Sequence, residues 1–310
     1  MAKESAVCEV RDFCEQQKQP QLSGDIKIAV QIHIFYTDLI PELVAALQSI
    51  GHPFDLYVTT DNRQKADEIQ AELVGALTAE GFLQKTEVKV CGNQGRDVIP
   101  FLQQIAPVCR QYAYICHLHT KKSKDPELGD AWRKYLYQTL LGNRSVVDNV
   151  LQLFETDPAV GMIFPETFPA LVRWMNWGVN KKLAVEIADS VGVKVVPFMD
   201  GKKEVLIFPA GNMFWARSEA VQQLLCYPLA DSDIPPEKGQ LDGTIMHAFE
   251  RLWSYTAKHN GYRTVLMKAN YAQAYMLGER KGPNRLADTL LPYGSRRRAL
   301  VKWLISPFRK

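Results

Sequence analysis

The strongest structural signal in the chain is IKIAVQIHIFY, residues 26–36, which runs directly into TDLIPELVAALQSI, residues 37–50. The first segment is rich in β-branched residues and has the length of a strand, whereas the apolar residues of the second recur at helical spacing. Together the two segments predict a β-strand that is followed at once by an amphipathic α-helix.

The same order of strand and helix recurs through the first half of the chain. FDLYVTTD (54–61) precedes NRQKADEIQAELVGAL (62–77), EVKVCGNQGRD (87–97) precedes VIPFLQQIAPVCRQY (98–112), and YAYICHLHT (112–120) is a fourth strand. Strands that alternate with helices are typical of a parallel sheet with helices on its faces. We therefore expect an α/β fold with a Rossmann-like, mostly parallel central sheet flanked by helices.

The second half is less regular but shows no repeat and no low-complexity linker. Helices are expected near 129–143, near 146–158 and from about residue 242 onward, and strands near 160–166 and 208–217. We predict one interwoven domain over 25–280, in which residues 25–125 and 126–280 form two halves. Residues 1–24 are polar and predict a loosely held arm or a short helix, and residues 281–310 form a basic tail.

Composition narrows the class of protein. Hydrophobic residues make up 46% and charged residues 23%, which is ordinary for a globular protein. Six of the 37 basic residues lie in the last sixteen positions. The rest of the chain has 37 − 6 = 31 basic residues and 34 acidic ones, so its net charge is slightly negative. Nucleic-acid binding is therefore not expected. The six cysteines form no CxxC pair, and no signal peptide or membrane span is recognisable, so we expect a cytoplasmic protein with reduced thiols.

Ligands of such sheets bind beyond the carboxyl ends of the strands. His117 and His119 stand at the end of the fourth strand, on one face because they are two residues apart, and Lys121 and Lys122 follow directly. Two imidazoles can hold a divalent metal or an anion, and the adjacent lysines favour the anion. The alternative is a pair of hydrogen-bonded histidines beside solvated lysines.

The loop after the third strand is a second candidate site. Asn93 and Gly95 are followed by Arg96 and Asp97 at a predicted helix start, where free backbone N–H groups attract phosphate. The spacing matches neither a phosphate-binding loop nor a dinucleotide fingerprint. An equally acceptable interpretation makes Asp97 an N-cap and the glycines a turn.

Two later motifs place polar residues at breaks in apolar segments. Gly211 and Asn212 interrupt the strand FPAGNMFWAR, which indicates either close approach of a ligand or a bulge. Asp242 lies at the start of a later predicted helix, about where an N-cap is expected. No nucleophile elbow is present, so hydrolase chemistry of that kind is not expected.

The order of the motifs resembles the rhamnan synthesis protein F family over about residues 26–275. The combination of NQGRD, HLHTKKS, FPAGNMFWAR and LDGTIMHAFER carries the resemblance. The family implies bacterial cell-surface polysaccharide assembly by a glycosyltransferase with a variant GT-A fold. It also implies a donor in which UDP or dTDP carries a hexose or deoxyhexose, and an acceptor that is lipid-linked or a polysaccharide.

The resemblance also assigns roles to individual residues, with the first half of the domain binding the nucleotide and the second the acceptor. The nucleotide would contact Thr37 and Asp61, and Asp242 would be the general base of an inverting transfer. The acceptor or sugar pocket would contain Gly211, Asn212 and Trp215, with Trp174 and Trp177 as further stacking candidates. For the three tryptophans, packing in the core is an equally acceptable interpretation. The donor diphosphate or sugar would be bound by Asn93, Gly95, Arg96, Asp97, His117, His119, Lys121 and Lys122.

One departure from the GT-A pattern concerns the metal. GT-A enzymes end the fourth strand in Asp-x-Asp, which holds a divalent ion, whereas this chain has His117 and His119 there. The charge of the leaving diphosphate can be stabilised by a metal or by fixed cations. We therefore expect Arg96, Lys121 and Lys122 to supply it, with a metal conceivable only through the two histidines.

The sequence leaves two alternative functions open. One is a non-catalytic carbohydrate-binding or scaffold subunit of a polysaccharide assembly complex, to which the missing Asp-x-Asp gives weight. The other is a dehydrogenase, which the absence of a glycine fingerprint after the first strand argues against. The tail 295–310 combines six basic residues with apolar ones, which is typical of a segment that binds anionic lipid. We expect peripheral attachment to the inner face of the plasma membrane, and the alternative is a C-terminal helix packed on the domain.

Overall fold

The structure is a computed structural model, which describes residues 8–13, 26–92, 94–120, 122, 126–230, 233–234 and 243–268. Its main feature is an eight-stranded sheet with strand order β1-β10-β6-β9-β5-β2-β3-β4, and a separate hairpin pairs β7 with β8. The strands are β1 (Glu9–Arg11), β2 (Ile28–His33), β3 (Phe54–Thr60), β4 (Leu83–Val90), β5 (Tyr114–His119), β6 (Val160–Pro165), β7 (Phe198–Asp200), β8 (Lys203–Val205), β9 (Phe214–Arg217) and β10 (Arg263–Met267).

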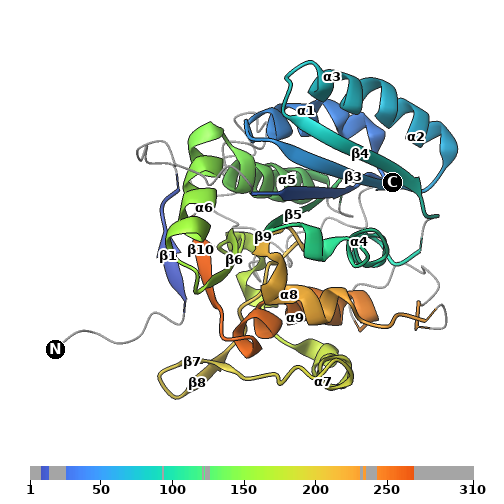
Figure 1. Ribbon diagram of the computed structural model, residues 1–310. Helices are drawn as coiled ribbons and strands as arrows, with labels where there is room; N and C mark the ends of the chain where they lie inside the picture. The colour runs from blue at the N-terminus through green and yellow to red at the C-terminus, as the bar shows by residue number, and fades with distance from the viewer. Residues whose placement is uncertain are drawn as a thin grey trace, which may run out of the picture.

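Helices cover both faces of the large sheet (Figure 1). The α-helices are α1 (Ile40–Gln48), α2 (Arg63–Ile69), α3 (Gly75–Thr78), α4 (Val98–Ile105), α5 (Pro126–Leu141), α6 (Arg144–Thr156), α7 (Lys181–Ser190), α8 (Ser218–Leu225) and α9 (Ile245–His259). The shorter helical segments are η1 (Thr37–Leu39), η2 (Gln70–Val74), η3 (Cys109–Gln111), η4 (Pro169–Trp174) and η5 (Gly178–Asn180).

The predicted α/β fold with a mostly parallel sheet is confirmed. Every neighbouring pair of the large sheet is parallel except for those of β9, which runs antiparallel to both β5 and β6. Because of this reversal, the amino end of β9 lies at the same edge as the carboxyl ends of β5 and β6. The loop before β9, which contains Gly211 and Asn212, therefore lies beside the end of β5.

The chain builds the sheet outward in two directions from β2. It first adds β3 and β4 on one side and then returns to place β5 on the other side of β2. Ligands of open α/β sheets bind at such a switch point, outside the carboxyl ends of the strands. The crevice beyond β2 and β5 is therefore the position in which the fold favours a site.

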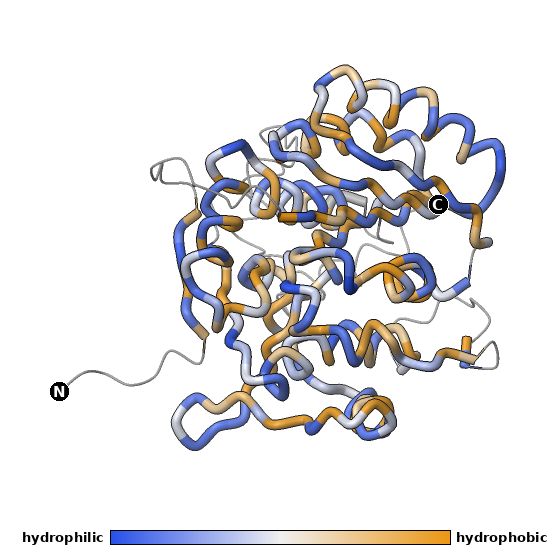
Figure 2. The backbone as a smooth tube through the Cα atoms, viewed as in Figure 1, coloured by the Kyte–Doolittle hydropathy of each residue, from blue (hydrophilic) through white to orange (hydrophobic). Residues whose placement is uncertain are grey.

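Two apolar cores lie on opposite faces of the sheet. One contains side chains of α1, α5 and α6, and the other contains side chains of α4, α8 and α9. All six residues of β2 and all six of β5 are buried, as a strand covered on both faces requires. Figure 2 shows hydrophilic residues along the outer helix α2 and a largely hydrophobic α4, in which seven of eight residues are buried.

Three details differ from the expectations. Residues 9–11, predicted within a loose arm, form the edge strand β1, which pairs with β10, and the side chain of Phe13 beyond it is buried. Strand β4 begins at Leu83 rather than at residue 87. Helix α4 ends at Ile105, just before Pro107, because proline has no N–H to continue the helical hydrogen bonds.

Candidate functional site

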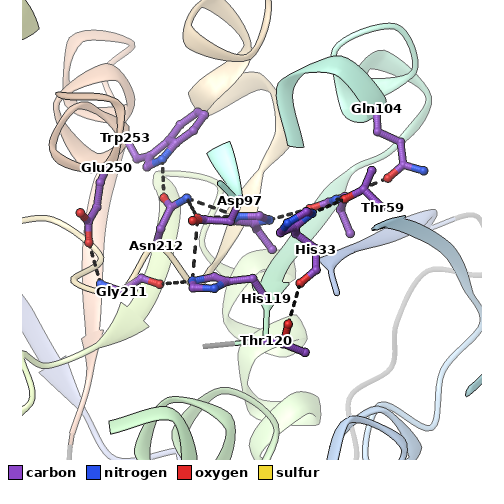
Figure 3. Close-up of polar contacts among 12 residues, drawn as sticks. His33, Thr59, Asp97, Gln104, His119, Thr120, Gly211, Asn212, Glu250 and Trp253 are labelled. Atoms are coloured by element: carbon purple, nitrogen blue, oxygen red, sulfur yellow. Dashed lines mark hydrogen bonds and ion pairs between the residues drawn. The ribbon is translucent and has the colours of Figure 1, made fainter. Parts of the chain in front are cut away.

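The carboxylate of Asp97 is the centre of a polar cluster at the carboxyl end of β5 (Figure 3). Asn212 Nδ2 donates to Asp97 Oδ2 at 2.6 Å. The Nε2 atoms of His117 and His119 lie 3.7 and 3.8 Å from the same oxygen. The structure thus brings together four residues that the sequence predicted for the site, from the α4 start, β5 and the loop before β9.

Asp97 occupies the N-cap position of α4, but its side chain makes no capping hydrogen bond to that helix. Two consecutive left-handed residues, Gly95 (φ 76°) and Arg96 (φ 55°), precede it. A Cβ on Gly95 would lie 2.0 Å from a side-chain atom of Ile99, so only glycine fits there. This turn directs the Asp97 carboxylate toward β5. Asp97 is therefore the N-cap residue by position, but its side chain does not cap the helix.

The ring of His117 is fixed by a buried amide. Its Nδ1 lies 2.8 Å from Gln31 Oε1, and because the Gln31 Nε2 donates to Thr59 Oγ1, the amide oxygen must accept from the ring. His117 Nε2 is then the unprotonated nitrogen and faces Asn212 Nδ2 at 3.3 Å. Phe101 stacks on the ring with centroids 4.0 Å apart. His117 is fully buried, so it orients the cluster from within the core.

Asn212 uses every polar atom of its amide. Nδ2 faces Asp97 and His117, and Oδ1 accepts from Trp253 Nε1 at 2.8 Å. The residue adopts φ 53°, a left-handed conformation that costs an ordinary residue about 1 kcal/mol or more. Strain at a residue that is fully hydrogen-bonded and buried indicates that the surrounding contacts impose its conformation.

Gly211 holds the neighbouring loop to both α9 and β5. Its N–H donates to Glu250 Oε1 at 2.7 Å, and its carbonyl accepts from His119 Nε2 at 2.7 Å. Gly211 has φ 93°, and a Cβ at this position would lie only 2.8 Å from Leu136 and 3.0 Å from Trp132. No other residue fits unless these side chains are displaced. Glycine is therefore needed here because the backbone passes close to the side chains of Leu136 and Trp132.

Burial and charge together set the protonation of the cluster. Burial alone would raise the pKa of Asp97, but the adjacent His119 and His117 rings and the Asn212 hydrogen bond hold it well below its usual range. Burial lowers the pKa of His117, although Asp97 opposes the shift. Burial also lowers the pKa of His33 to about 4 against the opposing charge of Asp97. At neutral pH the cluster therefore contains an ionised carboxylate beside neutral His33 and His117.

A second group of polar residues surrounds the loop that follows β2. Lys65 Nζ donates to the Phe35 carbonyl at 2.7 Å, pairs with Asp61 at 2.8 Å and lies 4.1 Å from the centroid of the Phe35 ring. Lys122 Nζ pairs with Asp38 at 2.6 Å and lies 4.6 Å from the centroid of the Tyr36 ring. Two ammonium groups thus lie against consecutive aromatic rings.

Thr120 fixes that loop to the end of β5. Its Oγ1 accepts from the backbone N–H groups of Phe35 at 2.9 Å and Tyr36 at 3.1 Å, and its own N–H donates to the His33 carbonyl. Thr37, predicted to contact a nucleotide, begins η1 directly after this loop. The ends of β2, β3 and β5 are therefore joined at the switch point by direct polar contacts.

Arg96 connects the cluster to the start of α9. Its Nη1 lies 3.2 Å from His247 Nε2, and His247 Nδ1 lies 2.7 Å from Thr244 Oγ1. The Thr244 backbone N–H also donates to His247 Nδ1 at 3.4 Å, so this ring closes a capping box at the start of α9. Gly243, at the start of this helix, donates its N–H to Asn180 Oδ1 at 3.0 Å.

The remaining predicted residues have different positions. Trp215 is fully buried, donates its indole N–H to the Leu140 carbonyl, and belongs to the core on the α5 side. A ring without an exposed face cannot stack on a sugar, so the structure does not support its predicted place in a sugar pocket. Trp177 is half-buried against Tyr255, with its indole N–H on Glu204. Asn93, Lys121, Asp242, the Trp174 side chain and the tail 295–310 lie outside the described residues.

The described side chains do not form a metal site. Among them, no group of three or more histidine, cysteine, aspartate or glutamate residues is arranged to hold an ion. Asp97, His117 and His119 converge, but the shared oxygen of Asp97 receives the Asn212 N–H, and His119 Nε2 is engaged by the Gly211 carbonyl. In this conformation these residues fit a hydrogen-bonded cluster better than a coordination sphere.

Several site residues were missed by the sequence analysis. They include Gln31 and His33 on β2, Lys65 on α2, Thr120 after β5 and Trp253 on α9. Gln31 and His33 could have been noticed, because a glutamine and a histidine at alternate positions of a buried strand point to one face and need polar partners. No local pattern marks Lys65 or Trp253.

Comparison with known proteins agrees with the order of motifs. A family model described as rhamnan synthesis protein F matches residues 8–262. Two curated relatives from Xanthomonas campestris pv. campestris, strains B100 and ATCC 33913, both bear the name "Uncharacterized protein WxcX" and are 32% and 31% identical over 240 residues. Those residues are 77% of this chain and 32% of each relative, so the chain spans about a third of the length of the curated relatives it matches. The chain therefore belongs to the rhamnan synthesis protein F family, whose description links it to polysaccharide synthesis.

Proposed function

We propose that the chain is a glycosyltransferase of bacterial cell-surface polysaccharide synthesis. It moves a hexose or deoxyhexose from a UDP- or dTDP-linked donor to a lipid-linked glycan or polysaccharide acceptor. Three observations support this proposal: membership of the family, a mostly parallel α/β sheet, and polar residues gathered at its switch point. The acceptor and the pathway are proposed from the family description alone, because the chain matches only about a third of the length of each curated relative.

The observation that carries the proposal is the arrangement around Phe35 and Tyr36. Two ammonium groups, from Lys65 and Lys122, lie against these rings at the carboxyl end of β2. Aromatic faces suit a nucleobase, and ammonium groups suit the phosphates attached to it. In the proposed complex, Asp61 and Thr37 border the nucleoside, and Lys122 leaves its pair with Asp38 to meet the diphosphate.

Catalysis would depend on stabilising the nucleoside diphosphate as it leaves. Negative charge develops on its oxygen when the glycosidic bond breaks, and cations fixed in a partly buried crevice stabilise that charge with little reorganisation. Arg96 and Lys122 come from two sides of the site, and Lys121 is proposed as a third cation. Asn93 and Gly95 would contribute backbone N–H groups of the turn before α4.

The general base is proposed to be Asp242, beside the start of α9. An inverting displacement needs a carboxylate that can take the proton of the acceptor hydroxyl. Asp97 is poorly suited, because a carboxyl group with a pKa well below its usual range is a weak base. Glu250 is engaged by the Gly211 N–H. Asp242 remains the candidate, with Gly211 and Asn212 on the sugar side of the crevice.

A second candidate function is a non-catalytic carbohydrate-binding or scaffold subunit of a polysaccharide assembly complex. The replacement of Asp-x-Asp by His117 and His119, whose Nε2 atoms face protein groups, favours this alternative. The two functions differ in nucleotide binding. A carbohydrate-binding subunit has no need of a nucleotide site at the β2 loop.

A thermal-shift screen separates the two functions. The protein would be heated with UDP, dTDP and their glucose, galactose and rhamnose derivatives, each with and without EDTA. The transferase proposal predicts that at least one nucleotide sugar raises the melting temperature, by an amount that follows its affinity. If none of them does so while free oligosaccharides do, the binding-subunit function replaces it. Loss of the shift in EDTA would show that the fixed cations do not suffice.

Attachment to an anionic membrane through residues 295–310 is proposed to bring the chain to a lipid-linked acceptor. Among the described residues, no helix has both the length and the apolar character needed to cross a membrane. Because the tail combines basic and apolar residues, vesicles of phosphatidylglycerol should retain the full chain and lose a variant truncated after Gly294. Equal retention of both chains would refute the attachment.

A further inference from the structure

The two oxygens of the Asp97 carboxylate have different surroundings. Oδ2 receives the Asn212 N–H and faces His117 and His119. Within the described part of the chain, Oδ1 takes part in no hydrogen bond or ion pair. The side chain is 14% exposed, whereas His117 and Asn212 beside it are almost wholly buried. Asp97 is therefore not wholly buried, and its Oδ1 has no partner among the described residues.

The carboxylate is held in place from three directions. Asn212 is anchored to Trp253, His117 is anchored to Gln31, and His119 is anchored to the Gly211 carbonyl. A polar side chain fixed so firmly loses little rotamer entropy when a ligand binds, which is a property of binding-site residues. The N-terminus of α4 lies directly beside it, and its dipole also favours a negative charge there.

The charge of Asp97 limits the chemistry of a partner for Oδ1. A phosphate oxygen brought against an ionised carboxylate would be repelled, whereas a hydroxyl group can donate to it in a charge-assisted hydrogen bond. A nucleotide sugar offers hydroxyl groups on the sugar and negative charge on the diphosphate. The position therefore suits the sugar rather than the diphosphate.

We propose that Asp97 accepts, through Oδ1, a hydrogen bond from a hydroxyl group of the transferred sugar, and so selects donors that carry a hydroxyl at that position. This inference rests on the proposed function and deepens it. The resemblance leaves open whether Asp97 binds the diphosphate or the sugar of the donor, and this inference chooses the sugar. His117, His119 and Asn212 then serve as positioning residues for the carboxylate.

The test uses Asp97→Asn and compares a nucleotide sugar with its own nucleoside diphosphate. Binding of UDP and UDP-glucose, or of dTDP and dTDP-glucose, would be measured by calorimetry in wild type and variant. The inference predicts that the variant binds the nucleotide sugar about 10- to 100-fold more weakly, because a hydrogen bond to a charged group is lost. Its affinity for the diphosphate alone should change less than about threefold. Asp189→Asn, on the exposed surface of α7, is the matched control and should change neither affinity.

The outcomes separate this inference from the function on which it rests. Equal weakening for both ligands would show a merely structural role for Asp97, and tighter binding of the diphosphate would place Asp97 beside the phosphates; either result overturns the inference. If wild type binds no nucleotide at all, the proposed function fails and this inference fails with it. Retained diphosphate binding also shows that the variant is folded.

A measurement on wild type remains decisive if Asp97→Asn does not fold. Deoxygenated donors that lack one sugar hydroxyl at a time would be compared with the parent nucleotide sugar. A buried polar group left without its partner discriminates strongly against the deoxy analogue, so one position should cost about 100-fold in binding or transfer. Equal binding of every deoxygenated donor would contradict the inference.

Discussion

Asn212 Nδ2 lies 2.6 Å from Asp97 Oδ2, although 115 residues separate the two along the chain. The contact joins the turn before α4 to the loop before β9. It can form only because β9 runs antiparallel and so presents its amino end at the edge where β5 ends. One reversed strand in a parallel sheet thus brings the two halves of the site together.

Asn212→Ala should be among the most destabilising single substitutions at this edge. It leaves the buried Trp253 indole N–H without its acceptor and the Asp97 carboxylate without its nearest donor. We expect the free energy of unfolding to fall by about 2–4 kcal/mol. Urea unfolding measures it, with Asn176→Ala at an exposed position as the control. A loss as small as that of the control would mean that the amide is not holding the cluster.

Gly95→Ala and Gly81→Ala form a matched pair. The two glycines have nearly the same backbone angle, φ 76° and φ 78°, so alanine is strained equally at both. Only at Gly95 does the new Cβ meet another side chain, that of Ile99, whereas nothing lies within 4 Å of it at Gly81. We expect about 1 kcal/mol of destabilisation at Gly81 from backbone strain. The loss at Gly95 should exceed it by a further 1–3 kcal/mol from overpacking.

The same pair also tests the turn before α4. The Gly95→Ala loss should be accompanied by weaker nucleotide-sugar binding, because the turn sets the direction of Asp97. Equal destabilisation at Gly95 and Gly81 would show that the packing against Ile99 is loose, and that only the backbone angle requires glycine in this turn.

Acid should destabilise the protein in part through His33. Burial lowers its pKa to about 4 in the folded protein, from an ordinary value near 6.5, so the unfolded chain binds the proton more readily. The contribution of His33 is therefore complete above pH 6.5 and is lost as the pH falls toward 4. The loss is about 3 kcal/mol at most, from 1.4 kcal/mol per pKa unit.

His33→Asn isolates that contribution, because its amide can keep a hydrogen bond to Thr59 Oγ1 without titrating. The free energy of unfolding of the variant should fall less than that of wild type between pH 6.5 and 4. Both proteins still lose the contribution of His117 as the pH falls below 6.5, whereas that of Asp97 is lost only below its ordinary pKa of 3.8. Parallel curves for the two proteins would exclude His33 as a source of the acid sensitivity.

Lys65→Met and Lys122→Met test the nucleotide side of the site. Each removes one ammonium group beside Phe35 or Tyr36 and keeps much of the apolar length of the side chain. We expect each to weaken nucleoside diphosphate binding about five- to tenfold, with a smaller dependence on salt concentration. Lys203→Met, on the exposed β8, is the control. Unchanged affinity in both variants would remove the two lysines from the site.

Much of the fold was predictable because it depends on local patterns. The strand-length runs that became β2, β3 and β5 and the amphipathic pattern of α1 are local signals, and tertiary structure did not override them. The short edge strand β1 was not predictable, since three residues, two of them charged, form a strand only because β10 offers a partner. The early start of β4 is likewise decided by pairing with β3.

The site was only partly predictable for a related reason. His117 and His119 were identified from their place at a strand end, but their roles depend on partners far along the chain, such as Gln31 and Gly211. The sequence could not decide between a sugar pocket and the core for Trp215, because a tryptophan on a strand gives no sign of which face it occupies. In register, Trp215 pairs with Cys116 and Phe214 with His117, so Trp215 points away from the histidines.

Hydrogen exchange with and without a nucleotide sugar tests the central claim most directly, because it locates the ligand on the chain. With the nucleotide sugar that gives the largest thermal shift, the account predicts slower exchange in the peptides that contain residues 33–38, 61–65, 94–98 and 210–213. Peptides from α7 and from the β7–β8 hairpin should be unchanged. Protection confined to those outer segments, with unchanged exchange after β2 and before α4, would contradict a nucleotide-sugar site at the carboxyl edge of the sheet.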